Sequence, residues 1–146
     1  MGMKKKQAAV EAILKKAPVV PVMVIEDVKQ AVPLARALVA GGLPVLEITL
    51  RTDAAIDAMK AIMAEVEGAI VGSGTVLTPE QFKQCSKIGC AFAVSPGASG
   101  KLLGAAEDYD MPLLPGAVTA SEVMALLEWG YTFQKFFPAE PAGGTA

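Results

Sequence analysis

The 146-residue chain is 53% hydrophobic and 19% charged, which predicts a single folded domain over residues 1–146 and excludes intrinsic disorder. Its formal net charge of −2 lacks the basic excess typical of nucleic-acid-binding proteins. No apolar run reaches the roughly 18 residues of a membrane span, and no apolar signal segment precedes Val10, so we expect a cytoplasmic protein that binds neither membranes nor nucleic acid.

Short apolar runs alternate along the chain with amphipathic segments. We expect strands over residues 19–25, 45–50, 69–76, 91–95, 112–116 and 133–137. A first helix is expected over residues 4–16, and a short one over 101–106. The other helices should begin at the N-caps Asp27, Thr52 or Asp53, Thr78 and Thr119, and end at Gly41, Gly68, Gly89 and Gly130. In the last of these helices, Val123, Leu126 and Leu127 are expected to face inward.

This alternation of strands and helices predicts a parallel sheet covered by helices. Two architectures are compatible with it: an open doubly wound sheet and a (β/α)8 barrel. No G-x-G-x-x-G loop follows the first strand, which weakens a dinucleotide-binding fold. Unusual polar residues lie at the ends of several strands, as in a barrel, so we expect the barrel.

The chain contains no histidine, and its two cysteines are Cys85 and Cys90. The missing imidazole excludes Ser-His-Asp and Cys-His sites and histidine-ligated zinc. Two thiols cannot complete a tetrahedral zinc site, so we expect the cysteines to be small buried hydrophobes.

Residues 45–51 form a strand with a polar face. Side chains alternate along a strand, so Leu46 and Ile48 share one face while Glu47, Thr49 and Arg51 share the other. In a barrel the polar face points into the lumen, where an acid and a guanidinium are costly unless they are paired or used. A structural Glu47–Arg51 ion pair is the alternative to a functional site.

Lys135 lies on the strand face that also carries Phe133 and Phe137. Aromatic neighbours remove water from the amine, and desolvation favours its neutral form. A neutral lysine can attack a carbonyl carbon and form a Schiff base. Alternatively, the lysine extends to solvent at the barrel rim.

Two further candidates follow other strands. Ser73 and Thr75 are expected on one face between glycines, where Thr75 could donate a hydrogen bond to a substrate oxygen or, alternatively, to the backbone of the core. Pro96 could shape a pocket wall or simply terminate a strand.

Several segments occur together in a characteristic order. They are residues 19–22 (VVPV), 41–42 (GG), 46–52 (LEITLRT), 72–77 (GSGTVL), 95–97 (SPG), 114–116 (LPG) and 135–140 (KFFPAE). This set resembles the 2-keto-3-deoxy-6-phosphogluconate (KDPG) and 4-hydroxy-2-oxoglutarate (KHG) aldolase family over essentially the whole chain. The resemblance implies a class I aldolase on a (β/α)8 barrel, a homotrimer, and no metal or other cofactor.

By resemblance, Lys135 is the Schiff-base lysine and Glu47 is the general acid and base. Arg51 and Thr75 hold the carboxylate of the pyruvyl group, and Pro96 and Phe137 form apolar walls. The implied substrates are pyruvate and a phosphorylated 2-keto acid, and the implied reaction is reversible cleavage of KDPG to pyruvate and glyceraldehyde 3-phosphate. Cleavage of 4-hydroxy-2-oxoglutarate to pyruvate and glyoxylate is a related possibility.

Six strands are predicted where a barrel has eight, and the phosphate site of such barrels follows strands seven and eight. We therefore expect the pyruvate half of an active site, without phosphate-binding residues. A longer protein, a truncated chain and a barrel split between two chains all remain open. The functional alternatives are an aldolase for an unphosphorylated acceptor and a catalytically impaired barrel that serves as a structural subunit.

Overall fold

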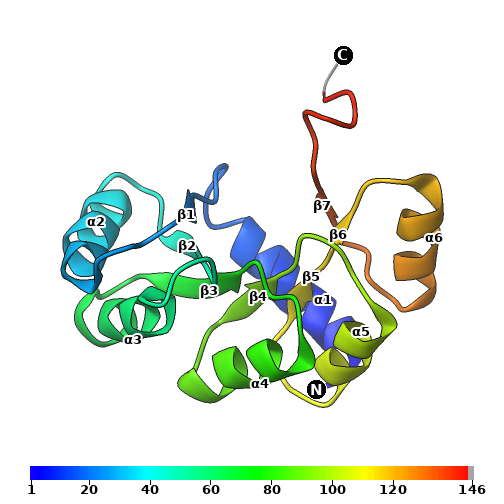
Figure 1. Cartoon of the computed structure of the whole chain (residues 1–146), viewed down its shortest axis with the longest axis horizontal. Coiled ribbons are helices and arrows are strands. Elements are labelled where there is room, and N and C mark those ends of the chain that lie inside the picture. Colours follow the sequence, from blue (N-terminus) through cyan, green and yellow to red (C-terminus); the bar gives the residue numbers. More distant parts are fainter. Residues whose placement is uncertain (145–146) are drawn as a thin grey trace.

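The computed structural model describes residues 1–144 and consists of parallel strands joined by helices (Figure 1). The helices are α1 (Met3–Leu14), α2 (Val28–Ala40), α3 (Ala55–Glu65), α4 (Pro79–Ile88), α5 (Gly100–Glu107) and α6 (Ala120–Glu128). The strands are β1 (Val22–Met23), β2 (Val45–Thr49), β3 (Ile70–Gly74), β4 (Phe92–Val94), β5 (Leu113–Leu114), β6 (Gly116–Ala117) and β7 (Lys135–Phe136).

The strands pair in the order in which they occur along the chain. One sheet has the order β1-β2-β3-β4-β5 and a second pairs β6 with β7, all in parallel. Pro115 separates β5 from β6, so the single strand expected over residues 112–116 is divided between the two sheets. A doubly wound sheet would reverse direction at a switch point, whereas sequential order is that of a barrel wall. In Figure 1, α2 to α5 follow one another along the outside of the strands.

The two faces of the strands pack against different partners. Leu46, Ile48 and Leu113 belong to the large buried cluster that also takes in residues of the outer helices. Val45, Phe92 and Val94 form a second cluster on the opposite face, packed against Ile13 of α1. The predicted alternation along β2 is therefore correct, and the face that carries Glu47 is the inner one.

Helix α1 is fixed to the rest of the structure by two buried polar side chains. The Gln7 Oε1 atom accepts hydrogen bonds from the backbone of Thr132 at 2.9 Å and of Phe133 at 3.1 Å, just before β7. The Lys6 Nζ atom donates to the carbonyls of Ala106 at 2.6 Å and Glu107 at 3.1 Å, at the end of α5. The Lys6 bonds satisfy carbonyls at the C-terminal end of α5 that would otherwise have no partner within the helix.

Most of the predicted helix starts are confirmed. Asp27 and Thr78 accept hydrogen bonds from backbone N–H groups at the starts of α2 and α4, and Thr119 forms a capping box with Glu122. The prediction of Thr52 or Asp53 as an N-cap was wrong, because α3 begins after Ala54, which makes no side-chain cap. The Thr52 hydroxyl is engaged elsewhere, donating to the Ile25 carbonyl at 2.5 Å.

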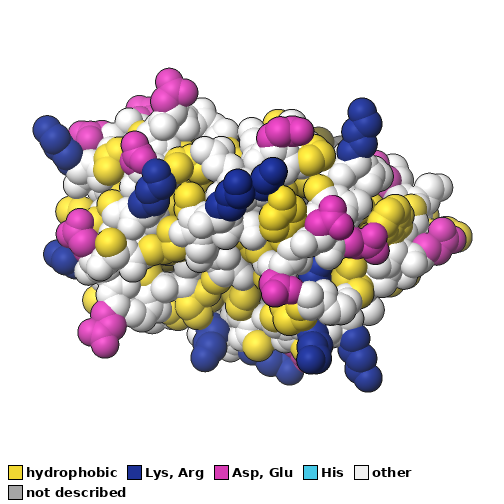
Figure 2. Space-filling view, turned by 90° about the horizontal axis from the view of Figure 1, so that it is seen from below, with side chains coloured by type: hydrophobic (Ala, Val, Ile, Leu, Met, Phe, Trp, Pro, Cys, Tyr) yellow, Lys and Arg dark blue, Asp and Glu magenta, His cyan; other side chains and the backbone are white. Residues whose placement is uncertain are grey.

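Helix α6 is less covered than its sequence predicts. Leu126 is buried, but Val123 is 38% and Leu127 is 51% exposed, so the expected inward face was wrong for both. At the other end of the strand array, Val22 and Val24 are also about half exposed. Figure 2 shows apolar patches between acidic and basic side chains on one face of the molecule. Among residues 1–144, no helix is long and apolar enough to cross a membrane.

Candidate active site

An amine and a carboxyl group meet on the inner face of the strands. Lys135 of β7 and Glu47 of β2 are 88 positions apart in the sequence, yet Lys135 Nζ donates to Glu47 Oε1 at 3.4 Å. The Glu47 side chain is 5% exposed and that of Lys135 is 25% exposed. The carboxyl group is thus shielded from water, whereas the amine remains reachable from solvent.

Phe137 supplies the aromatic neighbour that the sequence predicted for Lys135. The Lys135 Nζ atom lies 5.1 Å from the centre of the Phe137 ring, within the range of a cation–π contact. The alternative of a lysine extended fully into solvent does not hold, because Glu47 and Phe137 both contact its amine.

Burial sets the acidity of Glu47. Loss of hydration raises the pKa of its carboxyl group, while the positive charges of Lys135 and Arg51 act in the opposite direction. The net pKa is raised, so Glu47 holds a proton at higher pH than an exposed glutamate does. A carboxyl group that keeps its proton more readily is suited to act as a general acid as well as a base.

Arg51 contacts Thr75 rather than pairing with Glu47. The Arg51 Nε atom donates to Thr75 Oγ1 at 3.1 Å, and both follow the ends of their strands. In the described part of the chain, the ion partner of Glu47 is Lys135, so the alternative of a structural Glu47–Arg51 pair is wrong. The Arg51 side chain is exposed, which leaves its other guanidinium nitrogens available to an anion.

Thr75 reaches Arg51 through an unusual backbone conformation. Its φ of 54° is in the left-handed region, which β-branched residues rarely adopt. The expectation that Ser73 and Thr75 share a face was wrong, because β3 ends at Gly74 and the chain turns there. Ser73 instead faces the buried Cys85 on the helix side of the sheet.

The remaining candidates occupy the neighbouring strand ends. Pro96 follows β4 and is half-buried, and its carbonyl lies against Gly116 of β6, where there is no space for a side chain. Its role as an apolar wall stays a prediction. Cys85 and Cys90 are buried, as expected, 0% and 6% exposed.

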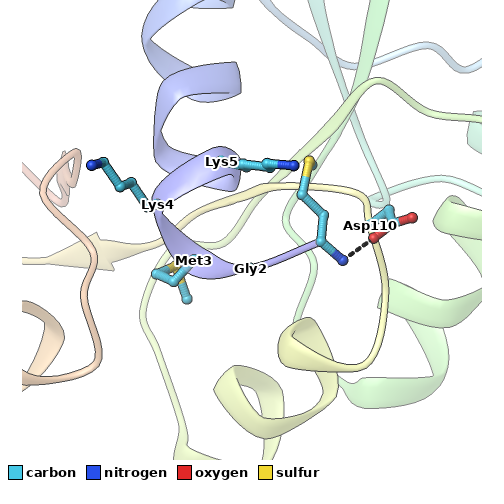
Figure 3. A pocket seen from close by; sticks show the side chains of 6 residues that line it. Gly2, Met3, Lys4, Lys5 and Asp110 are labelled. Carbon is cyan, nitrogen blue, oxygen red and sulfur yellow. Dashed lines mark hydrogen bonds and ion pairs between the residues drawn. The ribbon is translucent and has the colours of Figure 1, made fainter.

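A hollow at the start of α1 is separate from this site. Met1, Gly2, Met3, Lys4, Lys5 and Asp110 line it, and the N-terminal amine pairs there with Asp110 (Figure 3). None of the predicted site residues belongs to it. Among residues 1–144, no group of three or more His, Cys, Asp or Glu side chains is arranged to hold a metal ion.

Gly74 belongs to the site but is not among the residues that the sequence pattern singles out. It leaves the space that the Glu47 carboxyl group occupies. The available signal was the pair of alternate glycines, Gly72 and Gly74, which leaves one strand face without side chains.

In this structure, parallel βα units bring a lysine amine beside a shielded carboxyl group. This is the active-site arrangement of an enzyme that works through a Schiff base. A sequence model of the KDPG and KHG aldolase family matches residues 10–146. The chain belongs to this family.

Individual relatives agree with this assignment. The KHG/KDPG aldolase of Escherichia coli K12 is 51% identical over 142 residues, which are 97% of this chain and 67% of the relative. The crystal structure of the Zymomonas mobilis ZM4 KDPG aldolase with 3-phosphoglycerate superposes with a TM-score of 0.91 at 49% identity, over 95% of this chain and 66% of that one.

A third relative was crystallised with a reaction intermediate. The KDPG aldolase of Legionella pneumophila, with pyruvate captured as a covalent carbinolamine, has a TM-score of 0.88 and 46% identity, over 92% of this chain and 65% of that one. The chain thus spans about two thirds of the length of the relatives that it matches.

Proposed function

We propose that the chain is a class I aldolase that reversibly cleaves KDPG to pyruvate and glyceraldehyde 3-phosphate. The observation that carries the proposal is the 3.4 Å contact between Lys135 Nζ and the shielded Glu47 Oε1. The captured carbinolamine of the Legionella relative supports a covalent pyruvate intermediate. The name of the E. coli relative supports 4-hydroxy-2-oxoglutarate as a second substrate.

The chemistry requires an amine and a proton carrier side by side. The neutral Lys135 amine attacks the keto carbon of the substrate, and Glu47 gives a proton to the carbonyl oxygen to complete the carbinolamine. Glu47 takes a proton back from the nitrogen, and the hydroxyl group leaves as water when it is protonated again. The resulting protonated imine accepts the electron pair of the breaking C–C bond, while Glu47 receives the proton of the hydroxyl group that becomes the aldehyde.

Arg51 and Thr75 are proposed to hold the carboxylate of the pyruvyl group. A guanidinium can bind a planar carboxylate through two parallel hydrogen bonds, and Thr75 already fixes the Arg51 Nε atom. Pro96 and Phe137 are proposed as the apolar walls beside the methyl group, since the Phe137 ring contacts Lys135 Nζ.

Replacing Arg51 with lysine should weaken pyruvate binding about tenfold or more, because an ammonium cannot form the bidentate contact. The measurement is the pyruvate concentration that half-saturates adduct formation at Lys135. Arg36→Lys, at an exposed arginine on α2, serves as the control and should change nothing. Unchanged half-saturation in Arg51→Lys would assign Arg51 a structural role only.

The proposed function is tested by incubating the chain with pyruvate and borohydride and measuring its intact mass. An aldolase should gain one reduced pyruvyl group, and peptide mapping should place it on Lys135. A folded chain that gains no adduct would contradict the proposal. Comparing the cleavage rates of KDPG and 4-hydroxy-2-oxoglutarate then tests the preferred acceptor.

A structural subunit without catalytic activity is the second candidate. Half-exposed apolar side chains at both ends of the strand array favour association with other protein, among them Val22, Val24 and Phe136. We propose a homotrimer, which sedimentation equilibrium would test. A cytoplasmic location stays a prediction.

A further inference from the structure

We propose that Gly74 is a positioning residue, whose missing side chain provides the space in which the Glu47 carboxyl group lies beside Lys135. The consequence for catalysis rests on the function proposed above for Glu47. The consequence for packing rests on geometry alone, and the two can be measured separately.

The Glu47 side chain fills the space where a side chain at Gly74 would begin. A Cβ atom added at Gly74 would have three atoms of Glu47 as its nearest neighbours: Oε1, in direct collision, Cγ at 2.7 Å and Cδ at 2.9 Å. Folded proteins do not contain Cβ contacts this short. An alanine at position 74 would therefore push the Glu47 side chain away from the place where it meets Lys135.

The Glu47 side chain is shielded from solvent and already contacts a second residue. It is 5% exposed, and the Lys135 amine lies 3.4 Å from Oε1. Parallel pairing of β2 with β3 holds the two backbones in register, with Thr49 opposite Gly74 and Glu47 opposite Gly72. A side chain at position 74 must therefore move the carboxyl group, the strand, or both.

Backbone conformation does not explain the glycine. The positive-φ glycines of the described chain are Gly42, Gly68, Gly89, Gly130, Gly143 and Gly144, and Gly74 is not among them. Position 74 therefore has a φ that any residue can adopt, and the contact with Glu47 is what excludes a side chain. The left-handed conformation belongs to the next residue, Thr75.

Gly72 provides a matched control on the same strand face. A Cβ atom at Gly72 would collide with the Phe92 ring instead of Glu47. Gly72→Ala should therefore damage packing to a similar degree without displacing the Glu47 carboxyl group directly.

The packing claim is tested by urea unfolding of Gly74→Ala, Gly72→Ala and each of them combined with Glu47→Ala. Glu47→Ala removes all three colliding atoms. We expect Gly74→Ala to lower the unfolding midpoint strongly in the native background and only slightly in the Glu47→Ala background, whereas Gly72→Ala lowers it equally in both. If Gly74→Ala alone does not fold, the double variant should fold. An equal loss at Gly74 in both backgrounds would overturn the proposal.

The catalytic claim is tested by the rate at which pyruvate forms its borohydride-trapped adduct. Displacement of the carboxyl group by about an ångström should slow this rate roughly 100-fold in Gly74→Ala. The same substitution should have little effect in a Glu47→Gln background, because Gly74 acts through Glu47. Equal slowing in both backgrounds would contradict a positioning role. If the native chain forms no adduct, the proposed function fails, and the unfolding experiment still decides the packing claim.

Discussion

Replacing Lys135 with alanine should abolish covalent capture of pyruvate, because only the amine at this position lies beside a shielded carboxyl group within the proposed site. A loss of the nucleophile removes the imine pathway altogether rather than slowing one of its steps. The fold should persist, since the Lys135 side chain is 25% exposed and its removal leaves no large buried cavity. The measurement is the intact mass of the folded variant after treatment with pyruvate and borohydride.

Two controls make this result specific. Lys60→Ala removes an exposed lysine of α3 whose Nζ lies 3.3 Å from Asp57, an ion pair of similar length outside the site, and adduct formation should be unchanged. Lys135→Arg retains the positive charge beside Glu47 but cannot form an imine, so it should remain folded and inactive. Capture of pyruvate by Lys135→Ala at the native yield would show that another lysine carries the chemistry.

The sequence predicts the order and the approximate bounds of the strands and helices well, because hydrophobic alternation and helix caps are local signals. The strand over residues 45–50, with Glu47 on its inner face, follows from side-chain alternation alone. The exposure of Val123 and Leu127 could not be predicted in this way. An apolar helix face indicates that burial is favourable, but whether anything covers it depends on elements elsewhere in the structure.

The sequence pattern predicts which residues belong to the candidate site, but it does not predict which of them contact one another. Sequence alternation places Glu47 and Arg51 on one face and leaves a pair between them open as an alternative, whereas in the structure Glu47 contacts Lys135, which lies 88 positions away in the sequence. Side-chain alternation predicts that the Thr75 side chain points to the same strand face as Ser73. Its left-handed backbone gives the side chain another direction. The first difference arises from tertiary packing, and the second from a backbone conformation that a threonine rarely adopts. Neither can be inferred from the neighbouring sequence.

Replacing Glu47 with glutamine should slow aldol cleavage by about 10²–10⁴-fold while pyruvate still binds, because the amide keeps the shape of the side chain but carries no proton to transfer. The measurement separates kcat from the pyruvate concentration needed for half-saturation. A matched carboxylate control is Glu65→Gln, on the exposed end of α3, which should leave both quantities unchanged. Native turnover in Glu47→Gln would remove Glu47 from the mechanism.

The same variant has an expected effect on stability that does not depend on activity. Burial raises the pKa of Glu47 in the folded chain above its value of about 4.3 in the unfolded chain. The folded state therefore binds the proton more tightly, and this stabilising contribution is complete below the unfolded pKa and is lost as pH rises through the folded pKa. Glutamine does not ionise, so Glu47→Gln does not lose this contribution. Its urea midpoint should therefore rise relative to that of the native chain as pH rises across this window. A constant difference between the two midpoints across the window would mean that the carboxyl group titrates as an ordinary exposed acid, and its proposed role as a shielded proton carrier would fail with it.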